Sequence, residues 1–306
     1  MVSEKGGISN VDKRRYISLL PPQTVDLEKI HYQGDNRLGA IVDTMYFSLQ
    51  GVRRSSGNIT LNQHISFQRH EPGLPLDLYH AFPGGSFGKQ EIPGKRTQYI
   101  WTLSARKLVL AFMEDMLPYC LSRRTKMEAA IDYIRDYQET SLVNLELLEA
   151  FREIGPDIFD ALPNMDYLGG LFDARGHIRL DESQQKRVWP LLEVGIIPPH
   201  DSLIGHLINA FGGHFHDQQA WIISSNQALV FLECISASSK TMFSLINDAT
   251  SYQKALNARH AERMIRENDS NHFTPLPKEL IDVHADQLAP LIRTFNQTRK
   301  DMFSYK

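Results

Sequence analysis

The chain has little of several features that would place it in a specialised class of protein. Its 306 residues include two cysteines, too few for a disulfide framework or a zinc module, which fits a reducing compartment. No apolar run approaches the roughly 18 residues of a membrane helix, so we expect no membrane insertion. The net charge of −3 argues against a strongly basic nucleic-acid-binding coat. The N-terminus has neither a signal-peptide core nor an arginine-rich, acid-free transit pattern.

What the chain does contain is an internal repeat. The segment Leu38-Gly-Ala-Ile-Val-Asp43 is echoed by Leu168-Gly-Gly-Leu-Phe-Asp173. A glycine-rich turn follows each segment, then a strand with a tryptophan, then an amphipathic helix. Four matched landmarks in one order indicate two copies of a single α/β unit.

Periodicity predicts the elements within each copy. In 59–68, apolar residues alternate with Thr60, Asn62, His64, Ser66 and Gln68, as in a strand with one polar face. Helices are expected over 74–82, 105–117, 124–138 and 141–154, with a hairpin through the glycine-rich turn. The predicted class is α+β, two αββαββα repeats with mainly antiparallel strands. The expected divisions are an N-terminal extension (1–34), a first repeat (35–138), a helical linker (139–163), a second repeat (164–261) and a C-terminal extension (262–306).

The two echoed segments resemble the LAGLIDADG motif of homing endonucleases and intron maturases. The resemblance extends over about residues 35–260. The repeat, the order of elements and the length resemble those of the single-chain, two-repeat members of that family. It implies a saddle of antiparallel sheets with the motif helices packed at a central seam. Small residues in those helices allow close approach. The seam residues are then Gly39, Ala40, Asp43, Gly169, Gly170 and Asp173.

The resemblance also implies a metal site that this chain does not reproduce. In the family, a carboxylate two positions beyond the motif's first Asp binds a divalent metal at the scissile phosphates. Met45 and Arg175 occupy those positions here, and neither supplies an oxygen ligand for magnesium. The catalytic residues are therefore expected to be lost. Arg175 either contacts a phosphate or forms a salt bridge with Asp43 or Asp173.

The predicted nucleic-acid-binding residues are basic and polar side chains of the two repeats. In the first sheet region, basic side chains outnumber acidic ones. The polar residues that alternate along 60–68, which we call the polar row, lie in the same region. After the last core helix of each copy come four basic residues, Arg123, Arg124, Lys126 and Lys240. They could contact phosphates, and ordinary helix-end solvation is the alternative. The apolar strand within 188–197 must be covered on both faces or offer a patch to a protein partner. His214 and His216 are too few for a zinc site. The full set is Arg53, Arg54, Asn62, His64, Gln68, Arg69, Lys89, Lys95, Arg96, Arg123, Arg124, Lys126, Arg175, Arg179 and Lys240.

These observations predict a catalytically inactive LAGLIDADG-type protein that binds rRNA or intron RNA in an organelle. Its role would be architectural, as in a mitochondrial ribosome, or that of a splicing maturase. We expect a mitochondrial location (alternatively chloroplast), protein partners, and one copy per complex. No cofactor is expected. The alternative is an active homing endonuclease that cuts double-stranded DNA with magnesium, and a DNA-binding regulator is a third possibility.

Overall fold

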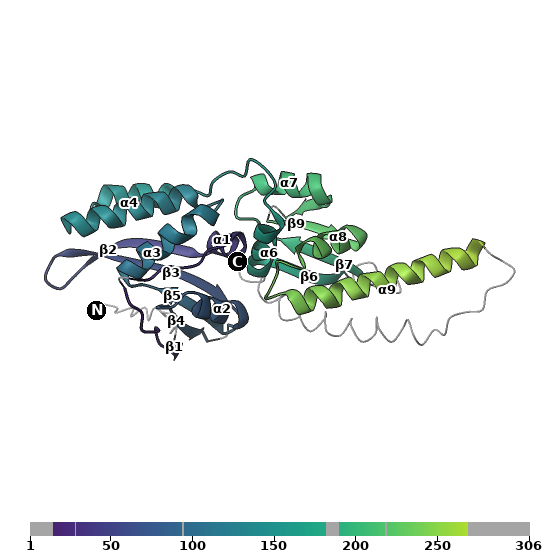
Figure 1. Cartoon of the computed structure of the whole chain (residues 1–306), viewed down its shortest axis with the longest axis horizontal. Coiled ribbons are helices and arrows are strands. Elements are labelled where there is room, and N and C mark those ends of the chain that lie inside the picture. Colours follow the sequence, from purple (N-terminus) through teal and green to yellow (C-terminus); the bar gives the residue numbers. More distant parts are fainter. Residues whose placement is uncertain (1–14, 28, 94, 182–189, 218, 269–306) are drawn as a thin grey trace, which may run out of the picture. The chain divides into compact units, whose positions relative to one another are not determined.

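The computed structural model describes residues 15–27, 29–93, 95–181, 190–217 and 219–268 (Figure 1). The two repeats contain the same elements in the same order, which confirms the predicted αββαββα pattern. The first comprises α1 (Asn36–Val42), β2 (Tyr46–Arg53), β3 (Ile59–Arg69), α2 (Gly73–Ala81), β4 (Ser86–Glu91), β5 (Gln98–Leu103) and α3 (Arg106–Met116). The second comprises α6 (Met165–Arg175), β6 (Gly176–Asp181), β7 (Leu191–Ile196), α7 (Ser202–Phe211), β8 (His214–His216), β9 (Ala220–Ser224) and α8 (Ser225–Ile235).

The remaining elements extend this shared pattern. They are β1 (Arg15–Leu20), the 3-10 helix η1 (Leu117–Tyr119), α4 (Arg124–Thr140), α5 (Leu145–Glu153) and α9 (Phe243–Asn268). The N-terminal extension contributes β1, which pairs with β4 at the edge of the first sheet. Of the two terminal extensions, residues 1–14 and 269–306 lie outside the described residues.

Both sheets are antiparallel and share one strand order. The first runs β1-β4-β5-β3-β2 and the second β6-β7-β9-β8. Without β1 and taken from its other edge, the first sheet has the order β2-β3-β5-β4, which corresponds strand by strand to β6-β7-β9-β8 in the second. The predicted glycine-rich hairpin turn needs correction, because Gly84 and Gly85 connect α2 to β4 and residues 92–97 connect the hairpin strands β4 and β5. Gly84 has a φ of 91°, which favours glycine at that reversal.

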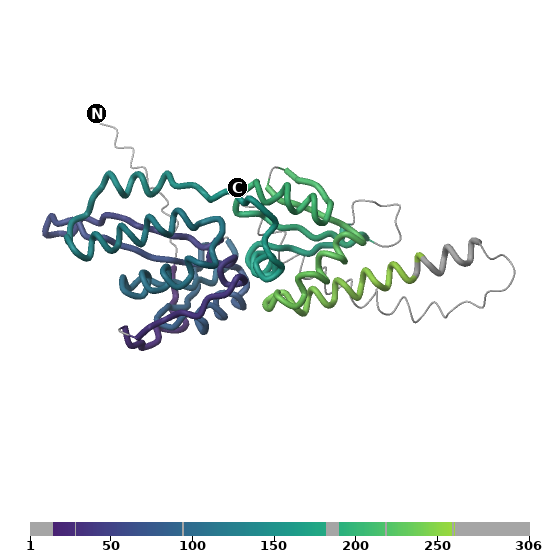
Figure 2. The backbone as a smooth tube through the Cα atoms, turned by 45° about the horizontal axis from the view of Figure 1, so that its top comes forward, coloured from purple at the N-terminus to yellow at the C-terminus, as the bar shows by residue number. Residues whose placement is uncertain are grey.

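The fold divides into two compact units that do not coincide with the two repeats. One unit consists of residues 1–32, 45–113 and 133–148 and contains the first sheet. The other consists of residues 33–44, 114–132 and 149–306 and contains the second sheet. Both motif helices, α1 and α6, belong to this second unit, and the chain path can be followed by colour in Figure 2.

Each unit has its own apolar core against one face of its sheet. In the first, the rings of Phe82, Trp101 and Phe112 pack within 6 Å of one another between centroids, joining α2 and α3 to β5. In the second, Phe231 of α8 packs edge-on against Trp221 and Phe172. No helix among the described residues is long and apolar enough to cross a membrane.

The motif helices begin at the side-chain caps that the sequence offers. Asp35 accepts the N–H of Leu38 at 2.7 Å at the start of α1, and Asn164 accepts the N–H of Tyr167 at 2.9 Å at the start of α6. Each cap satisfies a backbone donor that has no partner within the helix. The entry to each motif helix is therefore encoded locally.

Candidate functional site

Asp43, which ends α1, is a buried carboxylate whose hydrogen-bonding capacity is taken up by the protein. It accepts the backbone N–H groups of Leu121, Ser122 and Arg123 at 2.8, 2.9 and 3.0 Å. It also accepts the hydroxyl of Tyr167 at 2.6 Å. Burial raises the pKa of Asp43, and these donors oppose that shift. Asp43 thus fixes the segment that leads into α4.

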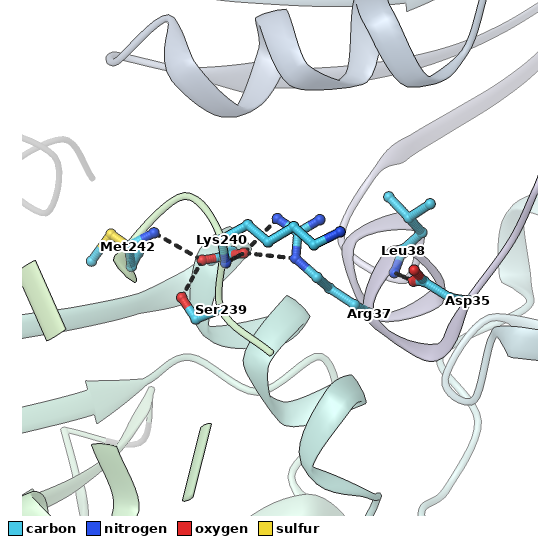
Figure 3. Close-up of polar contacts among 7 residues, drawn as sticks. Asp35, Arg37, Leu38, Ser239, Lys240 and Met242 are labelled. Carbon is cyan, nitrogen blue, oxygen red and sulfur yellow. Dashed lines mark hydrogen bonds and ion pairs between the residues drawn. The ribbon is translucent and has the colours of Figure 1, made fainter. Parts of the chain in front are cut away.

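Asp173 forms a similar network near the end of α6, and Figure 3 labels four of its partners, Arg37, Ser239, Lys240 and Met242. It accepts the Ser239 hydroxyl at 2.5 Å and the backbone N–H groups of Lys240 and Met242 at 3.0 Å each. It also forms a buried ion pair with Arg37, whose Nε and Nη2 lie 3.0 and 2.6 Å from Oδ2. Asp173 therefore fixes the segment that leads into α9.

The two networks are related by the repeat. Arg37 and Tyr167 each stand immediately before the Leu-Gly of their own motif, and each reaches the aspartate of the other motif helix. Neither residue belongs to the set of functional residues predicted from the sequence. Their equivalent positions in the two motifs are the only sequence feature that suggests a shared role. The packing of α1 on α6 is needed to show that each side chain reaches the other helix.

Small residues allow α1 and α6 to approach closely. A Cβ added to Gly170 would lie 2.0 Å from the carbonyl oxygen of Arg37, and one added to Gly39 would lie 2.2 Å from that of Tyr119. A Cβ on Gly169 would lie 2.7 Å from Ser238 Cβ. Ala40 is fully buried. Gly170 thus faces the backbone of the other motif helix, Gly39 faces the backbone of η1, and Gly169 faces Ser238, so none of the three has room for a larger side chain.

Removing the cross-helix hydroxyl should measurably destabilise the protein. Burial raises the pKa of Tyr167 well above its ordinary value, so the hydroxyl remains a donor to Asp43. Tyr167→Phe should lower the free energy of unfolding by roughly 1.5–3 kcal/mol, the range for a hydrogen bond to a charged group. Denaturant unfolding measures this. Tyr46→Phe, at an exposed tyrosine, is the control and should change the stability little; equal effects would contradict the assignment.

The metal centre implied by the motif does not fit these residues. The Met45 side chain is apolar and 1% exposed, and Arg175 is a cation. Asp43 and Asp173 are already held by N–H, hydroxyl and guanidinium donors. Across the described part of the chain, no three His, Cys, Asp or Glu residues are grouped to hold a metal ion.

Arg175, the last residue of α6, is a partly buried cation. Burial lowers the pKa of its partly buried guanidinium, and the positive charge of Arg123 lowers that pKa further. Asp173 instead pairs with Arg37, and the Nε of Arg123 donates to the backbone oxygen of Asp43 at 2.8 Å. Within the described ranges, Arg175 forms no ion pair with either aspartate, so the salt-bridge alternative is wrong.

The other basic residues that follow the core helices differ in exposure. Lys126 is partly buried, donates to the carbonyl of Ile154 at 3.0 Å, and lies over the ring of Phe151. Arg124 is exposed and 3.9 Å from Glu128. Lys240 is exposed, and its backbone N–H donates to Asp173. Of these four residues, Arg123 and Lys126 are partly buried, as Arg175 is.

The first sheet has a polar face without formal charge, which we call the neutral face. The strand register places its residues on one side of the sheet, opposite the helices. No Lys, Arg, Asp or Glu occupies a strand position on this side within the described chain. The neutral face consists of Tyr16, Ser18, Tyr46, Ser48, Gln50, Val52, Thr60, Asn62, His64, Ser66, Gln68, Ser86, Gly88, Gln90, Gln98, Ile100 and Thr102.

Several predicted basic residues do not share this surface with the polar row. Arg53 pairs in register with Ile59, and Arg69 lies over the ring of Phe67, so both are on the helix-covered side. Lys89 is on the same side and pairs with Glu91 at 2.6 Å. The expectation of one basic and polar surface is corrected here, because successive strand residues alternate between faces.

The remaining candidates of the first sheet lie in its connections. Arg54 donates from Nε to the hydroxyl of Thr60 at 2.9 Å and therefore reaches the neutral face. Lys95 and Arg96 lie between β4 and β5. The sequence does not predict four further residues of this face, Tyr46, Gln50, Gln90 and Gln98, because strand alternation identifies them only once the register is known.

The second sheet offers less accessible polar surface. In β7, Leu192, Val194 and Ile196 are buried in the core, and Glu193 and Gly195 on the other side are also buried. Residues 191–196 therefore expose no large apolar patch; Val188 and Trp189 of the predicted strand lie outside the described residues. Arg179 forms an ion pair with Glu193. His214 and His216 are exposed neighbours on β8, with ring centroids 6.2 Å apart.

Comparison with solved structures identifies the fold. I-GzeII, a LAGLIDADG homing endonuclease in complex with its DNA target, matches with a TM-score of 0.59 at 8% identity, covering 84% of this chain and 97% of that one. I-SmaMI bound to cleaved DNA matches with 0.55 at 13% identity, covering 78% and 92%. The meganuclease I-CpaMI bound to uncleaved DNA matches with 0.54 at 13% identity, covering 85% and 97%.

The similarity therefore extends over most of this chain and nearly the whole of each matched structure. This chain has the two-repeat LAGLIDADG fold. A scan against protein-family models gives no match, and neither does a search of curated protein sequences.

Proposed function

We propose that this protein binds RNA in an organellar ribonucleoprotein and does not hydrolyse phosphodiester bonds. The observation that carries the proposal is the state of the two motif-helix ends. Met45 and Arg175 stand where the motif's metal ligands are expected, and Asp43 and Asp173 are committed to structural hydrogen bonds. Two-metal hydrolysis needs oxygen ligands that these positions lack.

The neutral face supports nucleic-acid binding through contacts with bases more than through contacts with phosphates. The matched nucleases are bound to DNA, and this chain shares their fold. Amide and hydroxyl groups, such as those of Gln50, Asn62 and Gln68, can form hydrogen bonds with base edges. Because the strand positions carry no cation, they contribute few phosphate contacts.

The same face favours unpaired bases. Tyr46 is 55% exposed, and its ring lies 5.6 Å from that of His64. Exposed aromatic rings are the surfaces on which bases of single-stranded RNA stack. Burial lowers the pKa of His64, so its imidazole is mainly neutral at pH 7 and adds no lasting charge.

Exposed leucines favour a protein partner in the same assembly. Leu142, Leu145 and Leu147, at the start of α5 and just before it, are 72%, 52% and 49% exposed. Clustered exposed apolar side chains are typical of protein contacts. We therefore favour an architectural subunit of a mitochondrial (alternatively chloroplast) particle, such as the mitochondrial ribosome, present in one copy. An intron-splicing maturase is the second role, supported by the fold and the RNA-binding surface.

Binding and cleavage assays on the full chain test this proposal. Labelled single-stranded RNA should bind, and Tyr46→Ala with Asn62→Ala should weaken binding with little change in its salt dependence, because no phosphate contact is lost. Stacking on one aromatic ring contributes about 1–3 kcal/mol. Adding magnesium should leave duplex DNA and RNA uncut. Metal-dependent cutting of duplex DNA would instead support the homing-endonuclease alternative.

A matched pair of variants controls for the position of the changes. Arg53→Gln and Arg69→Gln alter cations on the helix-covered side of the same sheet. They should affect RNA binding less than the two neutral-face changes do. The reverse order would show that the neutral face is not the binding surface.

A further inference from the structure

Apolar side chains gather on the surface where the connection between α4 and α5 meets the β2–β3 hairpin. A Cβ added to Gly51 of β2 would lie 3.0 Å from the side chain of Ile59. The same Cβ would lie 3.2 Å from the side chain of Val143 and 3.3 Å from that of Leu145. Three apolar side chains therefore surround one exposed glycine. Together with Leu142, which precedes Val143, they form what we call the apolar patch.

The apolar patch is open to solvent. Leu142 is 72% exposed, Leu145 52% and Ile59 38%. All of its residues belong to the compact unit that contains the first sheet. Single apolar side chains on a surface are ordinary, whereas several that adjoin one another are typical of a surface that contacts another protein.

Local hydrogen bonds hold the connection in this conformation. The side chain of Asn144 accepts the backbone N–H of Glu146 at 3.1 Å, which caps α5. The Tyr133 hydroxyl of α4 donates to the carbonyl oxygen of Asn144 at 3.0 Å. The Thr140 hydroxyl accepts the N–H of Leu142 at 3.2 Å. The leucines are therefore presented to solvent by an ordered segment, which lowers the entropy cost of binding a partner.

The segment that presents the leucines is acidic. Between residues 136 and 148 the chain has three carboxylates and no lysine, arginine or histidine. All three carboxylates are exposed, and they are Asp136, Glu139 and Glu146. On the hairpin side, the exposed Arg53 pairs in register with Ile59. The α4–α5 connection therefore attracts cations and repels the phosphates of RNA.

We propose that the apolar patch binds a basic amphipathic helix of another protein. Such a helix has apolar side chains on one face and Lys or Arg beside them, so it can cover the apolar patch and reach the carboxylates together. A second copy of this chain would bring two acidic connections together, which disfavours self-association. The inference rests on the proposed function, because it names the chemistry of the protein partner within a ribonucleoprotein, whose other RNA-binding members carry basic segments.

Fluorescence anisotropy of a labelled synthetic helix of leucine and lysine, titrated with the full chain, tests the proposal. We expect binding that weakens as the salt concentration rises. Leu145→Ser should weaken it roughly tenfold, because an apolar contact near the centre of the patch is lost. Leu19→Ser, at a leucine of similar exposure on β1, is the control and should bind like the wild type. Equal affinities of these two variants would overturn the assignment of the surface.

Two charge changes with opposite expected signs test the basic character of the partner. Glu146→Gln should weaken binding about two- to fivefold, and Arg53→Gln should strengthen it by a similar factor, because a cation beside Ile59 repels lysine. Glu128→Gln, at an exposed glutamate of α4, is the charge-matched control and should have the smaller effect. A helix of leucine and glutamate should not bind. Equal binding of the two synthetic helices, or weaker binding by Arg53→Gln, would overturn a basic partner.

RNA binding and sedimentation separate the other occupants of this surface. Leu145→Ser should bind single-stranded RNA as the wild type does, and a tenfold loss would overturn the proposal in favour of an RNA surface. Sedimentation should show one copy, and a dimer that Leu145→Ser abolishes would overturn the proposal in favour of self-association. RNA binding without peptide binding would contradict this inference alone. Peptide binding without RNA binding would contradict only the proposed function.

Discussion

Asp173→Ala should lower the free energy of unfolding by about 3–5 kcal/mol. The change leaves the buried guanidinium of Arg37 without its partner, and breaking a buried ion pair in this way is strongly destabilising. It also leaves the Ser239 hydroxyl and the N–H groups of Lys240 and Met242 without an acceptor. Such a loss is a large part of the stability of an ordinary domain. Chemical denaturation monitored by circular dichroism measures it.

Two further variants identify the cause of the loss. Asp166→Ala removes an exposed carboxylate of the same helix, which accepts the Ser238 hydroxyl, and should lower the stability by about 1 kcal/mol. Arg37→Met in the Asp173→Ala background should restore part of the stability, because the unpaired buried charge is removed. If Asp173→Ala were within about 1 kcal/mol of wild type, the structural role of this aspartate would be wrong.

Gly170→Ala should lower the free energy of unfolding by about 1–3 kcal/mol or more, although alanine is the better helix former. The new Cβ would lie 2.0 Å from the carbonyl oxygen of Arg37, which is backbone and cannot rotate away. The two motif helices would have to separate, which would also disturb the Arg37–Asp173 ion pair. Thermal and denaturant unfolding both measure this change.

Gly205 provides the matched control for this prediction. It lies in the exposed part of α7, and a Cβ added there meets nothing within 4 Å. Gly205→Ala should therefore raise the stability by about 0.5–1 kcal/mol through helix propensity. A Gly170→Ala variant as stable as Gly205→Ala would show that the helices do not need their close approach.

Local patterns predicted the elements well because their causes are local. The caps Asp35 and Asn164, the alternation along β3 and the repeated motif are all readable within a few residues of the sequence. The prediction that the glycine-rich turn forms the hairpin is wrong, because a turn residue indicates a reversal and not which elements it joins.

The candidate site was less predictable because it depends on register and on contacts between distant residues. Strand alternation identifies two faces, but a basic residue near a strand can lie on either. Arg53, Arg69 and Lys89 proved to lie opposite the polar row. Arg37 and Asp173 are 136 positions apart, and only the packing of α1 on α6 brings them together. The sequence alone shows that Met45 and Arg175 are not carboxylates.

The most direct measurement is to recover the nucleic acid cross-linked to the native protein, with and without magnesium, and to treat it separately with ribonuclease and deoxyribonuclease. We predict RNA that ribonuclease removes and that magnesium leaves intact. The variant with both Tyr46→Ala and Asn62→Ala should recover less of it. Recovery of duplex DNA carrying magnesium-dependent strand breaks would contradict the proposal that this protein binds RNA and does not hydrolyse phosphodiester bonds.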